Sequence, residues 1–312
     1  MKFASIPGNP VPDGAVAGTV KTPDGVELRF ARWDSTAGKG TVCLFGGRGE
    51  FIEKYFETIG ELRQRGFAVA TMDWRGQGHS SRQLPDPRKG HVEVFPEYGV
   101  DLVTFMNRVV RPNCPQPYFA LAHSMGGAVV LQDMHADSRW FERAVLVAPM
   151  IDFPRTWIAR PARVLMRVLR LVGFGKSYVP GGNVDGGRTS RFDGNPLTSD
   201  PRRYARNAAL VAQDPTLGIG GPTVDWLDAA FDTIAAFAAS GYAGNITQPT
   251  LMIAAGADTI VSAPAIVRFA ARLPAGAHRL IEGARHEILQ EQDVYRAQLW
   301  AAFDAFVPGA SI

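Results

Sequence analysis

A chain of 312 residues with 46% hydrophobic and 20% charged residues has the composition of a globular protein, and no window approaches the run of about 18 apolar residues that spans a bilayer. The formal net charge of +3 is too small to indicate an anionic partner, and no zinc-finger spacing or arginine-rich arm points to nucleic acid. The length fits two small domains or one α/β domain that carries an insertion.

The beginning of the chain and its cysteines indicate the expected compartment. Prolines and a glycine interrupt residues 7–12, so we expect no secretory signal and a cytoplasmic location. Two cysteines, Cys43 in an apolar run and Cys114 in a proline-rich turn, form neither a disulfide framework nor a metal site. Their expected roles are a small buried residue and a loop thiol.

Short apolar runs alternate with segments of helical spacing between residues 26 and 149. The strand-like runs are 26–33, 41–45, 67–74, 118–123 and 144–149. The helical segments are 51–66, 98–110 and 125–137. This alternation predicts βαβ units, a mostly parallel sheet and right-handed crossovers.

The alternation stops after residue 149 and resumes only near the end of the chain. Two further strands are expected at 249–256 and 278–283, and a closing helix at 293–306. Connections between a helix and a strand normally take ~2–6 residues, so we interpret residues 150–245 as an inserted helical cap over the carboxyl edge of the sheet. The expected organisation is a core of residues 1–149 and 246–312 with this cap between them.

A serine follows one of these strands in a motif that almost matches the nucleophile-elbow pattern G-x-S-x-G. In AHSMG, residues 122–126, Ser124 lies between the predicted strand and the predicted helix, with alanine in place of the first glycine. Ala122 weakens the motif without breaking it, because the position requires a very small side chain and alanine adds one methyl group. The helix N-terminus favours the negative charge that would develop beside Ser124.

Two further residues complete a catalytic arrangement. A serine hydroxyl needs a histidine to take its proton and a carboxylate to orient that histidine. Asp258 and His286 follow the last two predicted strands, and the order Ser, Asp, His is that of α/β-hydrolases. We therefore predict Ser124 as nucleophile, Asp258 as acid and His286 as base. The N–H of Met125 and a second N–H from the glycine-rich loop 45–50 would hold the oxyanion.

Other polar residues near the predicted site have alternative interpretations. Asp152 is an alternative to Asp258, because some hydrolases place the acid one strand earlier. His123 is expected to pack within the elbow, and Glu287 to order the histidine loop. Segment 73–82, DWRGQGHSSR, is expected to form turns and salt bridges beneath the site, although it contains a histidine and serines.

Together these motifs resemble a branch of the α/β-hydrolase superfamily, the bacterial lysophospholipases related to monoacylglycerol lipases and grouped with serine aminopeptidase-like hydrolases. The resemblance runs from about residue 25 to residue 306 and includes GGRGEFIEKY, DWRGQGHSSR, DPRKGHVEVFPEY, LAHSMGGA, QDPTLGIGGPTVDWL and GARHEIL. Segment 214–227 is the most discriminating, because most hydrolases share the elbow and few share this segment. The resemblance implies an α/β-hydrolase fold with helices flanking the sheet, an inserted helical cap and the same triad.

The resemblance also assigns the second oxyanion donor. Aligning Glu50 and Tyr55 with the lipase pattern H-G-x-G-E places Gly46 at the usual histidine and Arg48 at the oxyanion position. The backbone N–H of Arg48 would then be the donor. The candidate substrate-binding residues are Gly47, Arg48 and Trp226.

The side chain of Arg48 allows two interpretations. A guanidinium presents a fork of donors that suits a phosphate, which leads to the hypothesis that Arg48 meets a phosphorylated head group. The alternative is an ion pair with Glu50 or Asp73.

Residues 155–176 of the expected cap combine basic and apolar side chains and contain no acidic residue. The basic residues are Arg155, Arg160, Arg163, Arg167, Arg170 and Lys176. Three of these arginines, at 163, 167 and 170, share one helical face, and most apolar residues lie on others. This pattern predicts contact with anionic membrane that salt weakens, and the alternative is a solvated face on a helix that packs over the site.

The sequence therefore predicts a serine hydrolase that cleaves a fatty-acyl ester from a single-chain lipid, with no metal and no organic cofactor. A lysophospholipid is the expected substrate, and monoacylglycerol lipase or small-ester carboxylesterase activity is the alternative. A ligand-binding protein that keeps the triad on a hydrolase fold is the alternative of a different class, because fold does not fix function. We expect no nucleic-acid partner, and peripheral contact with the inner face of the membrane through the cap.

Overall fold

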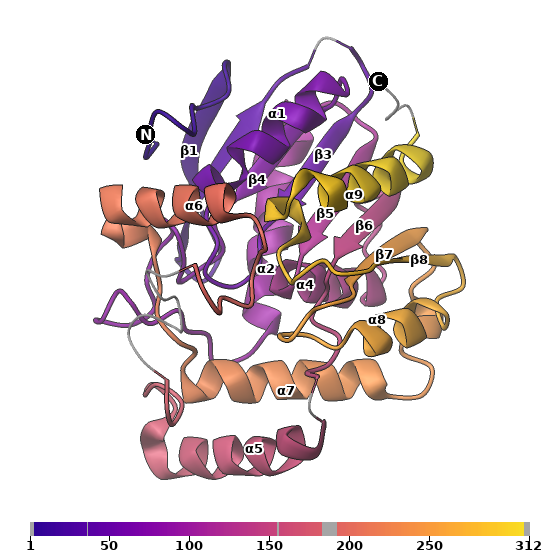
Figure 1. The fold of residues 1–312 in the computed structure, drawn as a ribbon. Coiled ribbons are helices and arrows are strands. Elements are labelled where there is room, and N and C mark those ends of the chain that lie inside the picture. The colour runs from indigo at the N-terminus through magenta and orange to yellow at the C-terminus, as the bar shows by residue number, and fades with distance from the viewer. Residues whose placement is uncertain (1–2, 36, 155, 183–191, 309–312) are drawn as a thin grey trace.

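One eight-stranded sheet runs through the computed structural model, which describes residues 3–35, 37–154, 156–182 and 192–308 (Figure 1). The strand order is β1-β2-β4-β3-β5-β6-β7-β8. The strands are Ala15–Lys21 (β1), Glu27–Trp33 (β2), Thr41–Phe45 (β3), Ala68–Met72 (β4), Tyr118–His123 (β5), Arg143–Val147 (β6), Thr250–Ala255 (β7) and Gly276–Ile281 (β8). Only the pairs of β2 with β1 and with β4 are antiparallel among the described strands. The prediction of a mostly parallel sheet with an α/β-hydrolase fold is confirmed.

Strand β1 was not among the predicted elements. Its sequence, AVAGTVK, contains no fully buried residue, because β1 lies at the edge of the sheet. Gly18 within it leaves room for the ring of Phe30, since a Cβ at position 18 would lie 3.0 Å from that ring. An edge strand of small and half-buried residues lacks the apolar run by which the other strands are identified.

Helices cover both faces of the sheet, which places two apolar cores around the central strands. The helices outside the inserted segment are Phe56–Gln64 (α1), Pro96–Phe105 (α2), Arg111–Asn113 (α3), Met125–His135 (α4), Ala263–Ala270 (α8) and Asp293–Phe306 (α9), with short turns Ile52–Tyr55 (η1), Met106–Val110 (η2) and Ile288–Gln290 (η6). Helices α1 and α9 pack with Val42 and Leu44 on one face. Helices α2, α4 and α8 pack with Cys43 and Phe45 on the other.

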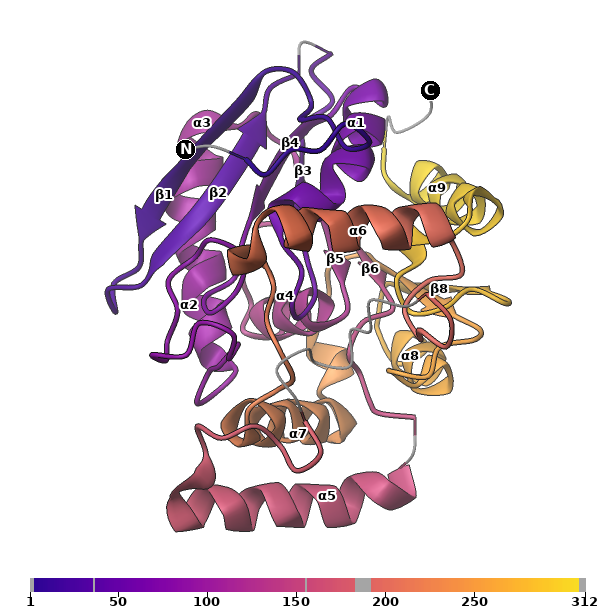
Figure 2. The same cartoon turned by 60° about the vertical axis from the view of Figure 1, so that its left-hand side comes forward.

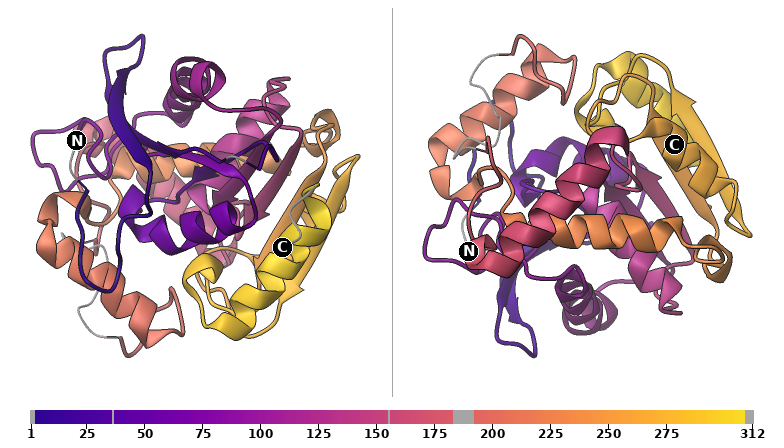
Figure 3. Two further views of the ribbon diagram at one scale, coloured as in Figure 1. Left: turned by 90° about the horizontal axis from the view of Figure 1, so that it is seen from above. Right: turned by 90° about the horizontal axis from the view of Figure 1, so that it is seen from below.

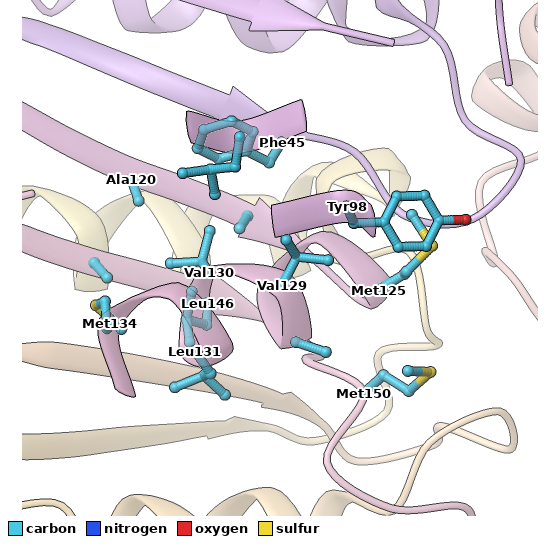
Figure 4. Close-up of a cluster of buried hydrophobic side chains, with 14 of the residues drawn as sticks. Phe45, Tyr98, Ala120, Met125, Val129, Val130, Leu131, Met134, Leu146 and Met150 are labelled. Atoms are coloured by element: carbon cyan, nitrogen blue, oxygen red, sulfur yellow. The ribbon is translucent and has the colours of Figure 1, made fainter. Parts of the chain in front are cut away.

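The core formed with α2, α4 and α8 lies directly beneath the turn between β5 and α4. Figure 4 shows Val129 and Val130 of α4 close to Phe45 and Ala120 of the sheet. Strands buried on both faces are almost continuously apolar, which is why β3 and β5 match the predicted bounds. Cys114 is buried in this core as well as Cys43, and both are free thiols.

The segment between β6 and β7 contains helices and lies at the carboxyl ends of the parallel strands; we refer to residues 150–245 as the cap. Its elements are Thr156–Leu169 (α5), Arg170–Phe174 (η3), Pro201–Gln213 (α6), Pro215–Leu217 (η4), Val224–Ala238 (α7) and Ala243–Asn245 (η5). Helix α7 lies between α5 and the core in Figures 1 and 2, and Figure 3 shows from below that α5 crosses it. None of the helices in the described part of the chain is long and apolar enough to cross a membrane.

Candidate active site

Ser124 occupies a tight turn at the carboxyl end of β5. Its backbone has φ 50° and ψ −115°, a conformation that residues with side chains rarely adopt, and α4 begins at the next residue. The turn approaches β3 so closely that a Cβ at Gly126 would lie 2.5 Å from the carbonyl oxygen of Gly46. Glycine is therefore required at 126, whereas Ala122 fits fully buried within β5.

The structure brings Ser124, His286 and Asp258 together in one hydrogen-bonded chain. His286 Nε2 lies 3.0 Å from Ser124 Oγ, and His286 Nδ1 lies 2.7 Å from Asp258 Oδ2. Asp258 follows β7 and His286 follows β8, so the three residues meet because parallel strands end at the same edge of the sheet.

The surroundings of Asp258 keep its carboxyl group ionised. Its Oδ1 accepts the N–H groups of Ile260 and Val261 at 2.7 and 3.0 Å. Burial opposes ionisation, but the charge and hydrogen bond of His286 and these two donors outweigh it and lower the pKa of Asp258 below its ordinary value. An ionised carboxylate on Nδ1 directs the other ring nitrogen toward Ser124 as a proton acceptor.

The carboxylate of the alternative acid, Asp152, is hydrogen-bonded to a group other than His286. Its carboxylate accepts the N–H of Phe153 at 2.8 Å, and its carbonyl accepts the N–H of Ser262 at 2.8 Å. Burial raises the pKa of Asp152. Within the described residues, the carboxylate bonded to His286 is therefore that of Asp258.

Behind Ser124 lies a buried group of charged side chains that the sequence did not predict. Glu50 accepts hydrogen bonds from the N–H of Gly47 and the hydroxyl of Tyr55, and it also lies 3.0 Å from His123 Nδ1 and 2.7 Å from Lys54 Nζ. Two members, Glu50 and Lys54, lie four positions apart in GGRGEFIEKY, and this spacing of opposite charges is the signal in the sequence that indicates them.

The charges of this group reinforce one another. Burial opposes ionisation of Glu50, but His123 and Lys54 outweigh it and hold its pKa well below the ordinary value. Burial likewise opposes protonation of His123, and Glu50 outweighs it and raises the pKa of His123. His123 Nε2 lies 3.2 Å from the carbonyl of His286, so His123 packs within the elbow and connects the loop 46–50 to the histidine loop.

Glu287 also belongs to this group, because its Oε1 lies 2.7 Å from Lys54 Nζ. Its N–H donates to the carbonyl of Leu197 in the cap at 2.8 Å. The contact with Lys54 fixes the residue next to His286, as expected from the sequence. Asp73 accepts from Arg29 Nε at 2.6 Å, so segment 73–82 contributes a buried salt bridge, also as expected.

The triad opens into a cavity of about 350 Å³ between the core and the cap. All three candidate substrate-binding residues, Gly47, Arg48 and Trp226, line it together with Ser124 and His286. Most of the remaining wall is apolar: Met125, Met150, Phe153, Ile219, Leu227, Ile260 and Val261. A cavity with an apolar wall and a polar centre suits an ester attached to a hydrocarbon chain.

The Arg48 side chain does not form the expected ion pair. Its Nη1 and Nη2 donate to the carbonyls of Gly220 and Gly221 at 3.0 and 2.8 Å, and its guanidinium lies 5.0 Å from the centre of the Trp226 ring. The expectation of pairing with Glu50 or Asp73 is therefore wrong. The cap attracts the guanidinium because two neighbouring carbonyls match its fork and an aromatic face attracts its charge.

The arginine face of α5 and η3 is turned toward α7. Arg163 and Arg167 lie 3.0 and 2.6 Å from Asp232, and Arg170 lies 3.1 Å from Asp228. These pairs offset the arginine charges, although Arg163 and Arg167 keep 43% and 44% of their side chains exposed, so this face is partly solvated as well as paired. Arg155 lies outside the described residues, and only the backbone of Arg160 is described.

The outward face of the same two elements is apolar. Its exposed side chains are Val164, Leu165, Val168, Leu171, Val172 and Phe174. We call these six residues the apolar face.

Among the described residues, no group of three or more His, Cys, Asp or Glu side chains is arranged to hold a metal ion.

A family model described as serine aminopeptidase, S33, matches residues 36–293. The chain belongs to this family. Lysophospholipase L2 of Escherichia coli strain K12 is 33% identical over 293 residues, which cover 91% of this chain and 85% of that protein. Membership of the S33 family agrees with the resemblance seen in the sequence.

Two solved structures show the same fold. A carboxyl esterase from Bacillus coagulans has a TM-score of 0.77 and 18% identity, over 96% of this chain and 99% of that one. A monoglyceride lipase from Saccharomyces cerevisiae has a TM-score of 0.73 and 20% identity, over 95% of this chain and 97% of that one. Because both identities are low, these similarities concern the fold alone, and they establish that this chain has the α/β-hydrolase fold.

Proposed function

We propose that this protein is a lysophospholipase-like serine hydrolase that releases a fatty acid from a single-chain lipid ester. The hydrogen-bonded chain of Ser124, His286 and Asp258 at the base of an apolar cavity carries the proposal. The similarity to lysophospholipase L2 supports the choice of substrate. The cap, residues 150–245, closes the cavity over a core formed by residues 1–149 and 246–312.

The chemistry follows from the geometry of the triad. Ser124 Oγ attacks the ester carbonyl carbon while His286 Nε2 takes its proton, and Asp258 stabilises the resulting imidazolium. His286 then protonates the departing alcohol, which leaves an acyl group on Ser124. Water, deprotonated by His286, attacks this acyl-enzyme and releases the fatty acid and the free serine.

The oxyanion formed in each step is held by two backbone N–H groups. Met125 is the first residue of α4, where an N–H has no acceptor within its own helix. Arg48 follows Gly47 in the loop beside the nucleophile, and a Cβ on Gly47 would lie 3.1 Å from Ser124 Cβ. Removing one such donor typically costs about 3–4 kcal/mol of transition-state stabilisation.

The apolar wall of the cavity indicates that the acyl chain is the part of the substrate with the most extensive contacts. Phe153, Leu227 and Ile260 lie in this wall, and burying each methylene of an acyl chain contributes about 0.8 kcal/mol. A monoacylglycerol is the second candidate substrate, because it places the same ester and chain in the cavity and differs only in its head group.

The protein also contacts membranes through the cap in this proposal. The six residues of the apolar face lie on α5 and η3, and α5 is the outermost helix of the cap. Segment 155–176 contains no acidic residue. Phe153 and Leu227 line the cavity and also pack in the cluster that supports α5. A lipid beneath α5 therefore lies near the wall of the catalytic cavity. Because the arginines pair with α7, we assign this contact to apolar insertion.

The first test is fatty-acid release from palmitoyl-lysophosphatidylethanolamine and palmitoylglycerol, measured side by side. We expect the phospholipid to have the higher kcat/KM by about tenfold, which is about 1.4 kcal/mol of transition-state discrimination. Ser124→Ala is the control, with turnover reduced by a factor on the order of 10⁶.

Two outcomes would contradict the proposal. A higher kcat/KM for the glyceride would reject the lysophospholipid as preferred substrate. Labelling of Ser124 by a fluorophosphonate without multiple turnovers of either lipid would favour a ligand-binding protein on a hydrolase fold.

A further inference from the structure

The side chain of Arg48 extends from the loop beside the nucleophile to the cap. Its two terminal nitrogens donate to the carbonyls of Gly220 and Gly221 at 3.0 and 2.8 Å, and its guanidinium packs on the ring of Trp226. All three partners belong to segment 214–227 of the cap. This side chain therefore joins the two sides of the catalytic cavity.

The cap residues that Arg48 contacts are themselves fixed to the core. The N–H of Gly220 donates to the carbonyl of Arg88 at 2.7 Å, and the indole N–H of Trp226 donates to the buried hydroxyl of Tyr98 at 3.0 Å. A guanidinium that binds two neighbouring carbonyls and stacks on a ring has little freedom to shift. The position of Arg48 thus depends on the position of segment 214–227.

On its other side the same loop lies against the nucleophile. The N–H of Gly47 is held by the Glu50 carboxylate, and a Cβ on Gly47 would approach Ser124 Cβ to 3.1 Å. A shift of the loop at Arg48 would move the backbone N–H assigned above to the oxyanion. A misplacement of 1 Å in a catalytic arrangement costs on the order of 10²-fold in rate.

We propose that the Arg48 side chain is a positioning residue that couples segment 214–227 of the cap to loop 46–50, which carries the second oxyanion donor. The position of segment 214–227 and the position of the second oxyanion donor are then set together. The inference rests on the proposed ester hydrolysis, and it assigns the guanidinium to the cap and not to a substrate phosphate. Lysine keeps the charge, but its point-like ammonium cannot reproduce the planar fork.

The test compares Arg48→Met and Arg48→Lys with Arg202→Met. Arg202 lies on α6 with 79% of its side chain exposed, so it controls for the loss of an arginine from the cap. The concentration of active sites is taken from the endpoint of fluorophosphonate labelling. Steady-state kcat and KM are then measured with palmitoyl-lysophosphatidylethanolamine, palmitoylglycerol and p-nitrophenyl butyrate.

We expect both Arg48 variants to lower kcat per labelled site by about 10- to 100-fold on all three esters, with a much smaller change in KM. Arg202→Met should match the wild type. A loss confined to the phospholipid and restored by lysine would overturn the proposal in favour of phosphate binding. An unchanged kcat per labelled site with a lower labelled fraction would overturn it in favour of a stability role. If the wild type hydrolyses only p-nitrophenyl butyrate, the lipid substrate proposed above is wrong. The effect of the Arg48 variants is then judged from kcat per labelled site on p-nitrophenyl butyrate.

Discussion

Ser124 holds a backbone conformation that costs about 1–3 kcal/mol for a residue with a side chain. Its N–H donates to the carbonyl of Val147 at 3.0 Å, and its carbonyl accepts from Ala128 at 3.2 Å and Met150 at 3.1 Å. These bonds attach the turn to the end of β6 and to the first turn of α4. The neighbouring backbone thus offsets the strain and keeps Oγ directed at His286.

At the same scale, Glu50 determines how the buried charges behind Ser124 respond to pH. Replacing one partner of a buried ion pair leaves the others uncompensated and costs about 3–5 kcal/mol. We expect Glu50→Gln to lower the free energy of unfolding by about this amount, because His123 loses its counter-ion and Lys54 keeps only that of Glu287. The difference in the free energy of unfolding between this variant and the wild type is measured by urea denaturation, followed by circular dichroism, at pH 3.5, 5.5 and 8.5.

The sign of the pH dependence follows from two opposite pKa shifts. The pKa of Glu50 is lowered, so its contribution is present above its ordinary pKa of 4.5 and is lost as the pH falls further. The pKa of His123 is raised, so its contribution is complete below its ordinary pKa of 6.5 and is lost as the pH rises through the folded value. The destabilisation by Glu50→Gln should therefore be largest between pH 4.5 and 6.5. An equal destabilisation at pH 3.5, 5.5 and 8.5 would reject this account, and Glu27→Gln on the exposed surface is the control.

At the scale of elements, the sequence identifies best those strands whose environment is uniform. Strand β3 is buried at every position and its bounds match the prediction, because burial on both faces requires a continuous apolar run. The sequence did not predict strand β1, because its pairing with β2, and not its own apolarity, places it in the sheet. Helix α5 was identified as amphipathic, but which face it turns inward depends on the acidic residues of α7.

Helix α6 of the cap is attached to the core by charges that meet at α1. Glu57 lies 2.5 Å from Arg203, 2.7 Å from Arg206 and 3.1 Å from Arg296 of α9. Burial opposes ionisation of Glu57, but these arginines outweigh it and lower its pKa from 4.5 to about 2. The network thus joins α1, α6 and α9.

We expect Glu57→Gln to lower the free energy of unfolding by about 1–2 kcal/mol at pH 7, allowing for solvent screening of a partly exposed group. Because the pKa is lowered, this contribution is present above pH 4.5 and is lost as the pH falls toward 2. Urea denaturation at pH 7, 4.5 and 3 measures it, again with Glu27→Gln as the control. A difference that stays constant over this range would show that the arginines do not stabilise the carboxylate.

At the scale of the whole molecule, the candidate site combines a part that the sequence indicates and a part that only the folded chain shows. Ser124, Asp258 and His286 each follow a parallel strand, and such strands end at one edge, so their meeting follows from topology. The contact of Arg48 with Gly220 joins residues 172 positions apart. No local pattern indicates it, because it depends on how segment 214–227 crosses the carboxyl edge of the sheet.

The proposed membrane contact of the cap gives a prediction for the whole molecule, which concerns the apolar face. We expect Leu171→Asp combined with Phe174→Asp to lower the rate on palmitoyl-lysophosphatidylethanolamine in phosphatidylglycerol vesicles by about tenfold or more. These two side chains are 79% and 54% exposed, and placing charges there removes their favourable transfer into lipid. Hydrolysis of monomeric p-nitrophenyl butyrate should be unchanged, because the triad is not altered. Val294→Asp, at a 60% exposed apolar residue of α9, is the matched control.

Salt separates apolar insertion from the electrostatic contact that the sequence predicts. At 0.5 M NaCl the charges of lipid head groups and exposed arginines are strongly screened, since the Debye length falls to about 4 Å. Insertion of the apolar face should persist under this condition, because Arg163, Arg167 and Arg170 already pair with Asp228 and Asp232 of α7. Cosedimentation with vesicles at 0.05 and 0.5 M NaCl distinguishes the two. Binding that disappears at high salt would assign the contact to the basic residues, and the double variant would then bind as the wild type does.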